Sequence, residues 1–462
     1  MSTVSEEIAD FSTTLSFRNL PGNVRLEAKK RLLDTLGCMI AAAKEPSVKA
    51  ALNFVKQYRN PSHSSIVMNR TKTLVQYAAL VNGIMGHSLE IDDTMPGVAH
   101  IGVIVIPTAL AMGEWQNING ELLLTSIVLG YEVTCRIGKA ALPGRLQFRG
   151  VHPTGVNGVF GASVLSSKIL DLDLAKTAAA IGISGSQASG LLEATRDGTW
   201  TKRFHAGWAA HNGIISAQIA KEGFTAPRAI LEGRLGFFNG IVGNSDRINQ
   251  ITTDLGKNYA ILEPNYKPYV SGVACHPGIN ATLRAIEEYN IRLPEIEEIE
   301  VRMQKWGIPL VAEPIERKVR PLNTVDAEFS VYYSVAVAAY KRGPPLPEDF
   351  TEDKISNPVI LRLAKKVKVI HDPELDKSTY ENGELHRAGK VTIKTKDGHA
   401  YHSSASKDFY KLTQKDVEEK FKAVTNRMLT KEKTESIVRM VKNIEKLKEI
   451  GQLMSSISEL EK

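Results

Sequence analysis

Histidines, carboxylates and lysines gather in four short segments of the chain, and their side chains could carry acid–base chemistry. Six of the eleven histidines lie between residues 87 and 276. The densest segment contains His87, Glu90, Asp92, Asp93, Thr94 and His100. On a helix, the spacing of three residues places His87 and Glu90 on one face, and Pro96-Gly97 then ends the helix. Burying this many ionisable groups is costly without a function, and the structural alternative is a capped helix end with a solvated acidic turn.

The same segment could in principle bind a metal ion. Histidine and aspartate are the usual ligands of hydrolytic zinc and two-metal sites. However, the segment contains no HExxH, HxH or HD pattern. We therefore predict no metal ligands in this protein.

The second segment runs from Arg149 to Gly161 and carries His152 directly before Pro153. Its glycines recur every third residue, which favours close helix packing and does not match the GxGxxG dinucleotide fingerprint. We expect His152 at the N-terminus of a helix, where free backbone N–H groups favour anions.

Two further segments add cations. Lys202, Arg203 and His205 lie within four residues, between two tryptophans. One short basic patch is too little for nucleic acid, and clustered cationic donors suit a small polycarboxylate better. The fourth segment leads from Lys267 to His276, where two predicted domains meet, and such junctions are common ligand sites.

The elements that must position these groups are mostly helices. Val24, Ala28, Leu32, Leu36 and Ile40 recur every fourth residue, which predicts a helix with one buried face. Runs rich in Ala, Gly and Ser at 76–90, 160–170 and 178–192 predict closely packed helices. A capping box at 413–416 and an apolar stripe at 437–447 predict helices that pack on the same domain.

Between these helical parts the pattern becomes that of strands. Residues 298–303 alternate apolar and charged side chains, and 367–370 and 390–396 are further strand candidates. Asp397-Gly398 predicts a tight hairpin turn into 400–403. We therefore predict a mainly α fold, with an all-helical domain from 1–265 and 405–462 and a smaller α+β domain from 266–404.

Composition excludes several classes of protein. The chain has 462 residues and a mild net charge of +7, which is ordinary for a globular protein of two or three domains. Three cysteines, Cys38, Cys135 and Cys275, lie too far apart for a disulfide framework or a CxxC metal site, and they suit a reducing cytosol. We find no export signal and no membrane-spanning stretch, and we expect a cytoplasmic protein without membrane partners.

The order of the motifs resembles one known family. His87-Ser-Leu-Glu-Ile-Asp-Asp-Thr is similar to the H-x-L-D-F-D-D-T signature of the MmgE/PrpD family, and His152-Pro-Thr-Gly is similar to its next block. Thr201-Lys-Arg-Phe-His205, Lys267-Pro-Tyr, His276-Pro and Glu328-Phe-Ser330 resemble later blocks in the same order. Together they cover about 250 residues.

This resemblance implies an enzyme of a particular kind. The family includes 2-methylcitrate dehydratase, cis-aconitate decarboxylase and an iminodisuccinate epimerase. Its members have a helical domain with an α+β lid, usually form homodimers and use no iron–sulfur cluster. The resemblance therefore implies a lyase on a di- or tricarboxylic acid that needs no cofactor, most similar to 2-methylcitrate dehydratase. Decarboxylation, epimerisation and a non-catalytic organic-acid-binding or scaffold role remain alternatives.

The family's reactions share a carbanion-like intermediate that needs a proton-transfer group and positioned cations. By resemblance, we assign His100 as acid or base, Lys202 and His152 to developing charge, and Asp93 to orienting a histidine. The expected substrate-binding residues are Glu90, Thr94, His205, Arg203, Lys267 and His276.

Three departures from the family pattern bear on the substrate. Glu90 replaces the usual aspartate and is one methylene longer. His100-Ile101-Gly102 stands where His-Pro-Gly or His-Pro-Ser is common. Gly272-Val273 stands where some dehydratases carry Cys-Arg, so one carboxylate anchor is missing there. These changes predict a smaller or less charged acid than 2-methylcitrate.

Overall fold

The first half of the chain folds as predicted because its apolar residues recur at helical spacing. The computed structural model describes residues 2–58, 61–377, 380–381, 384–385, 387–405 and 409–458. The predicted stripe from Val24 to Ile40 lies within one helix and is fully buried. The helices of this part are α1 (Val4–Thr14), α2 (Gly22–Ala41), α3 (Pro46–Val55), α4 (Val75–Gly86), α5 (Gly102–Trp115), α6 (Gly120–Ala141), α7 (Pro153–Ile169), α8 (Leu174–Gly185), α9 (Ala194–Asp197) and α10 (Thr201–Lys221).

One small sheet interrupts these helices. Strands β1 (Ser64–Ile66) and β2 (Asn69–Thr73) form an antiparallel hairpin that the sequence pattern did not predict. The hairpin is short and only β1 is buried along its whole length, so it carries little hydrophobic periodicity.

The α+β part contains a four-stranded sheet in the order β4-β3-β7-β8. Strands β3 and β4 run parallel, whereas β3–β7 and β7–β8 are antiparallel, and Gly398 takes the left-handed conformation in the predicted hairpin turn. All predicted strands are confirmed. The elements are α11 (His276–Glu288), β3 (Ile296–Met303), α12 (Ile308–Val311), α13 (Ile315–Val319), α14 (Thr324–Glu328), α15 (Val331–Lys341), α16 (Glu352–Ile355), α17 (Pro358–Ala364), β4 (Val367–His371), α18 (Pro373–Lys377), β5 (Tyr380–Glu381), β6 (Glu384–Leu385), β7 (Gly389–Thr395) and β8 (Ala400–Ser404).

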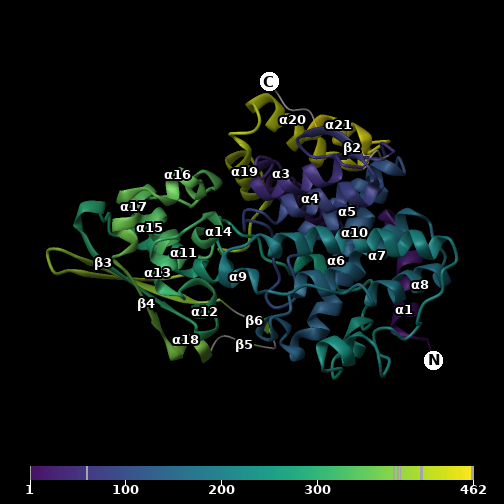
Figure 1. The fold of residues 1–462 in the computed structure, drawn as a ribbon, viewed down its shortest axis with the longest axis horizontal. Coiled ribbons are helices and arrows are strands. Elements are labelled where there is room, and N and C mark those ends of the chain that lie inside the picture. Colours follow the sequence, from purple (N-terminus) through teal and green to yellow (C-terminus); the bar gives the residue numbers. More distant parts are fainter. Residues whose placement is uncertain are drawn as a thin grey trace.

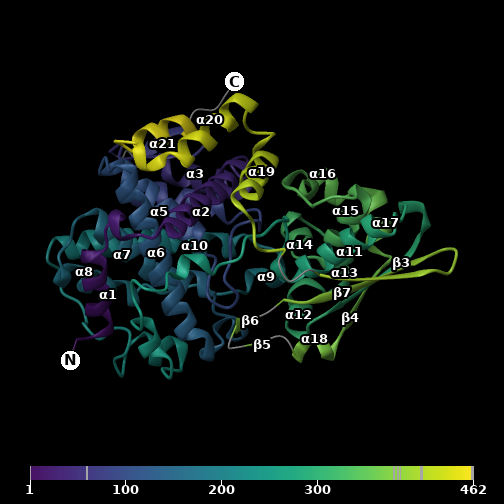
Figure 2. The same ribbon diagram turned by 180° about the vertical axis from the view of Figure 1, so that it is seen from behind.

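The C-terminal helices return to the helical part, beside α2 and α5 (Figures 1 and 2). They are α19 (Gln414–Thr425), α20 (Lys431–Lys442) and α21 (Gly451–Ser458). The capping box predicted at Thr413 is present, with Asp416 as its partner. The apolar stripe also packs as predicted, since Ile437, Val441 and Ile444 join the main hydrophobic cluster.

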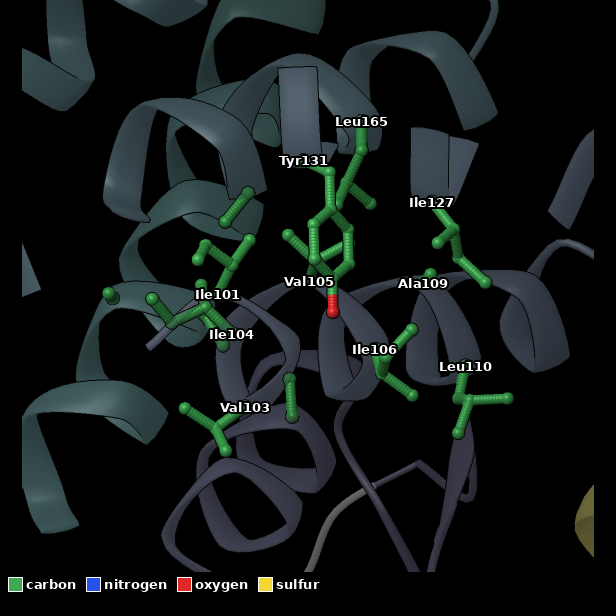
Figure 3. Close-up of a cluster of buried hydrophobic side chains, with 14 of the residues drawn as sticks. Ile101, Val103, Ile104, Val105, Ile106, Ala109, Leu110, Ile127, Tyr131 and Leu165 are labelled. Atoms are coloured by element: carbon green, nitrogen blue, oxygen red, sulfur yellow. The ribbon is translucent and has the colours of Figure 1, made fainter. Parts of the chain in front are cut away.

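Two hydrophobic clusters divide the molecule. The larger one contains side chains from α1–α8, α10 and α19–α21, and the smaller one lies mainly between the sheet and helices α11 and α15. Figure 3 shows part of the larger cluster, where α5 residues such as Ile104 and Val105 surround the ring of Tyr131 from α6. A large helical part and a smaller α+β part are therefore present, as predicted, and the boundaries at 265/266 and 404/405 stay predictions.

Helices α4 and α10 approach each other closely at two glycines. A Cβ atom on Gly83 would lie 2.6 Å from the Cα of Gly207, so neither position has room for a side chain. This contact confirms the predicted role of small residues in α4, and it aligns the end of α4 with the start of α10. Among the described residues, no helix combines the length and the apolar character needed to cross a membrane.

Candidate active site

The segment after α4 lies between the two hydrophobic clusters. Leu89 and Ile91 belong to the smaller cluster, whereas Met95 and Ile101 belong to the larger one. Helix α4 ends at Gly86, earlier than the predicted run to residue 90, and Glu90 takes the left-handed conformation with φ 49°. The prediction that His87 and Glu90 share a helical face is therefore wrong, because the chain has already left the helix.

Glu90 nevertheless lies at the centre of the site, between two lysines. One carboxylate oxygen contacts the ammonium group of Lys202 in the first turn of α10, and the other lies 3.1 Å from Nζ of Lys267. Burial acts to raise the pKa of Glu90, but the two ammonium groups hold it well below its usual range. Glu90 is therefore ionised and neutralises part of the positive charge of the site.

The two lysines differ in their pKa. Burial lowers the pKa of Lys202, whose ammonium group also lies 2.9 Å from Nε2 of His87. Lys267 is fully buried, but the negative charges of Asp92 and Glu90 outweigh burial and raise its pKa. Lys202 is thus the more acidic ammonium group and the better proton donor.

Asp92 holds two histidines at once. Its Oδ1 lies 3.2 Å from Nδ1 of His87, and its Oδ2 lies 2.7 Å from Nδ1 of His100. Burial outweighs the attraction of Asp92 and lowers the pKa of His100 to about 3 and that of His87 below its usual value. Both rings are therefore neutral at pH 7. A proton on Nδ1 donated to Asp92 leaves the Nε2 lone pair of His100 available as a base.

Asp93 does not have the predicted role. Its carboxylate accepts hydrogen bonds from the Tyr131 hydroxyl at 2.7 Å and the Gly102 backbone N–H at 2.8 Å, and it pairs with Arg31 at 3.3 Å. Burial raises its pKa to about 6. The expectation that Asp93 orients a histidine is therefore wrong, because its side chain faces α2 and α6 while Asp92 faces the histidines.

His152 and His205 form the other wall of the site. His152 precedes α7 as its N-terminal cap residue, as predicted, and its ring stacks on His87 with 5.8 Å between ring centres. Its Nδ1 lies 3.0 Å from Nδ1 of His205, while its Nε2 is buried without a hydrogen-bond partner. Burial lowers the pKa of His152 well below its usual value and that of His205 to about 4. The site therefore holds an unsatisfied imidazole nitrogen that a bound ligand could use.

The remaining predicted residues lie around this group. Arg203 points toward the α+β part and pairs with Glu328 at 3.0 Å, and burial raises the pKa of that carboxyl to about 8. Thr94 is held by backbone hydrogen bonds to Asn265. His276 begins α11, with Nε2 placed 3.1 Å from the Ser271 carbonyl oxygen. Among the described contacts, Thr94 and Arg203 make none to the central histidines.

A metal ion has one conceivable place here. The nearest ring nitrogens of His87, His100 and His152 lie within 4.8 Å of one another. However, Nε2 of His87 faces the Lys202 ammonium group and Nδ1 of His100 faces Asp92. A divalent cation would be close to a positive charge, so the arrangement suits an ammonium group better than a metal as the electrophile.

Sequence reasoning missed His87 and Asp92 as central residues. A usable signal was present, because apolar Leu89 and Ile91 alternate with Glu90 and Asp92. The segment is bent at Glu90 and is not a strand, yet the alternation still separates the two kinds of side chain. Leu89 and Ile91 are indeed buried in one cluster, while the two carboxylates both lie near Lys267.

Comparisons with known proteins identify the family of the chain. Residues 6–248 match the MmgE/PrpD N-terminal domain and residues 269–446 match the MmgE/PrpD C-terminal domain. A cis-aconitate decarboxylase-like protein of Aspergillus oryzae is 25% identical to this chain. The alignment covers 98% of this chain and 97% of that protein. Cis-aconitate decarboxylases of Aspergillus terreus and Homo sapiens are 24% and 26% identical to this chain, respectively. Both alignments cover 98% of this chain, and they cover 96% of the Aspergillus terreus protein and 94% of the human protein. The two domain matches span most of the sequence, and the chain therefore belongs to the MmgE/PrpD family.

Proposed function

We propose that this protein is a lyase that needs no cofactor and removes carbon dioxide from an unsaturated tricarboxylate of the cis-aconitate type. The observation that carries the proposal is the convergence of Lys202 and Lys267 with neutral His87, His100 and His152 in one buried site. Relatives named as cis-aconitate decarboxylases align over nearly the whole chain, which supports this choice of reaction.

In the proposed reaction, the C–C bond to the departing carboxylate breaks and carbon dioxide leaves. The electron pair moves across the neighbouring double bond onto the carbon beside a second carboxylate, which becomes enediolate-like. Lys202 and Lys267 stabilise this negative charge. Nζ–H of Lys202 then donates a proton to that carbon, and His87 Nε2 keeps the ammonium group in place. The reaction consumes one proton and yields a terminal methylene.

A hydro-lyase of the 2-methylcitrate type is the second candidate. The observation that favours it is the pair of His100 and Asp92, which leaves the neutral Nε2 of His100 free to remove a proton beside a carboxylate. Lys202 would then protonate the departing hydroxide. Lys202 donates a proton in both reactions, whereas only the dehydration requires His100 to remove one.

A substrate panel followed by NMR separates these reactions. The protein would be incubated separately with cis-aconitate, 2-methylcitrate and citrate. Decarboxylation gives new terminal-methylene protons and carbon dioxide, dehydration gives an internal alkene, and epimerisation gives only solvent exchange or a diastereomer. We expect decarboxylation of cis-aconitate. No change with any of the three acids would contradict the proposal.

We also propose that the protein is a cytoplasmic homodimer. Its three cysteines are all unpaired and buried, which suits a reducing compartment.

The surface that supports the proposed dimer is aromatic. Aromatic residues form a partly exposed ladder across α3, α4 and α10, in which Trp208 stacks on His211 and His211 on Tyr77. Phe204 and Phe54 extend this ladder and are about two-fifths exposed. Sedimentation showing only monomer at micromolar concentration would contradict the dimer.

A further inference from the structure

Arg387 carries a buried guanidinium for which the described part of the chain supplies no acidic partner. It precedes β7, and its Nε and Nη1 atoms are buried with no hydrogen-bond partner. Its contacts are to Tyr410, which shares a hydrogen bond with the guanidinium and places its ring 5.2 Å from it. Burial lowers the pKa of Arg387, and none of the described carboxylates forms an ion pair with it. Buried charges in proteins are normally paired, so a guanidinium that no described carboxylate neutralises is a candidate site for a bound anion.

The unpaired guanidinium lies next to the candidate active site. The ring of Tyr410 stacks on His276 with 5.8 Å between centres, and the backbone carbonyl of Tyr410 accepts a hydrogen bond from the N–H of Tyr266, beside Lys267. Burial, together with the positive charges of Lys267 and Arg387, lowers the pKa of His276. The Nδ1 atom of His276 is also buried without a partner. Arg387 and His276, which both carry buried nitrogen atoms without a hydrogen-bond partner, therefore both pack against the ring of Tyr410.

The charges of the site, summed with those of a bound polycarboxylate, require a further cation such as Arg387. Lys202 and Lys267 are offset by Glu90 and Asp92, with which they form ion pairs, and the neighbouring histidines are neutral. A polycarboxylate would bring at least two further negative charges into a buried space. At least one more cation is needed to offset them, and Arg387 is available.

We propose that Arg387 binds the carboxylate of the substrate that takes no part in bond breaking, with Nδ1 of His276 and the Tyr410 hydroxyl beside it. The guanidinium fork suits a carboxylate through two parallel hydrogen bonds. Arg387 thereby supplies the anchor that Gly272-Val273 lacks, from a different part of the chain. This proposal rests on the proposed function, because it assumes a polycarboxylate substrate at this site.

Binding of unreactive acids tests the proposal without turnover. Isothermal titration calorimetry would measure Kd for propane-1,2,3-tricarboxylate and for succinate with the wild type, Arg387→Gln and Arg387→Lys. We expect Arg387→Gln to weaken tricarboxylate binding by about ten- to a hundredfold and succinate binding by less than threefold. Arg387→Lys should recover part of the loss. Arg302→Gln, at an exposed position of the inner strand β3, is the matched control and should change neither Kd.

Thermal unfolding checks that Arg387→Gln weakens ligand binding and does not destabilise the fold. Because none of the carboxylates that the structure describes pairs with Arg387, Arg387→Gln should keep or raise the Tm of the free protein. Tricarboxylate should raise the Tm of the wild type more than that of the variant. Equal Kd values in wild type and Arg387→Gln, or no binding by the wild type, would overturn the proposal. Arginine-dependent binding without turnover of any acid would instead refute only the proposed lyase reaction.

Discussion

His100 and Asp92 form a hydrogen bond of 2.7 Å between Nδ1 and Oδ2, while Asp93 turns to Arg31 and Tyr131. The two neighbouring aspartates therefore serve different parts of the molecule. Asp92 fixes the tautomer and orientation of His100 and also holds His87. Asp93 joins the start of α5 to α2 and α6 inside the larger hydrophobic cluster.

Asp92→Asn should therefore reduce kcat much more than Asp93→Asn. The amide that replaces the Asp92 carboxylate can present N–H to the histidine and stabilise the wrong tautomer, so we expect a loss of roughly a hundredfold or more. Asp93→Asn should change kcat less than tenfold but lower the free energy of unfolding by about 1–3 kcal/mol at pH 7.5, since it removes one of the two carboxylates that pair with buried Arg31 and leaves only Glu27. Steady-state kinetics and urea unfolding measure both. A larger kcat loss for Asp93→Asn would contradict this division.

Glu90→Gln should destabilise the protein because it leaves Lys202 and Lys267 without a shared counterion. Breaking a buried ion pair from one side costs about 3 kcal/mol or more. The matched control is Glu263→Gln, whose pair with Lys139 is partly exposed, with side-chain exposures of 35% and 40%, and should cost less than about 1 kcal/mol. Urea unfolding at pH 7 compares the two variants. Equal losses would show that Glu90 is not the counterion of both lysines.

Much of the fold could be predicted because local patterns determine it. The four-residue repeat of α2, the alternation in β3 and the capping box at Thr413 each depend on nearby residues. The small hairpin β1–β2 lacks such a pattern, and α4 ends before the predicted residue 90, at Gly86. The C-terminal end of α4 depends on the following segment, where Glu90 takes a left-handed conformation. Contacts with Lys202 and Lys267, which are distant in sequence, hold Glu90 in that conformation.

The sequence predicted most residues of the candidate site but only part of their geometry. Motif order brought His100, His152, Lys202 and Lys267 together, and the structure places all four around one buried region. Which aspartate faces the histidines depends on how the bent segment after α4 lies between the two hydrophobic clusters. No sequence motif marks Arg387. Its place beside the site depends on packing against Tyr410, which a local pattern does not predict.

Gly83→Ala should disturb the contact between α4 and α10 that aligns His87 with Lys202. A Cβ atom there would lie 2.6 Å from the Cα of Gly207, where backbone must move. We expect a loss of about 1–3 kcal/mol in unfolding free energy together with a reduced kcat. Gly451→Ala is the control, because its Cβ would meet no atom within 4 Å. Wild-type stability in Gly83→Ala would contradict the close helix contact.

His205 should make stability depend on pH in a defined direction. Its pKa is lowered from 6.5 to about 4 by burial, so the unfolded chain binds a proton more readily than the native protein between these values. The resulting penalty is absent above about pH 7.5 and grows as the pH falls through 6.5 toward 4. Relative to the wild type, His205→Asn should therefore gain roughly 2 kcal/mol between pH 7.5 and pH 4.5. Urea unfolding at both pH values measures this difference, and a constant difference would refute the burial of a neutral imidazole.

The central claim is that the lysines and histidines of this site carry out the lyase reaction themselves. Its most direct test is a proton NMR time course of cis-aconitate in D2O with chelator-treated wild type and Lys202→Ala. We predict that the wild type forms a product with a terminal methylene and one solvent-derived deuterium on the carbon beside the retained carboxylate, and that Lys202→Ala is slower by at least about a thousandfold. An unchanged spectrum with the wild type, or wild-type turnover by Lys202→Ala, would contradict the claim.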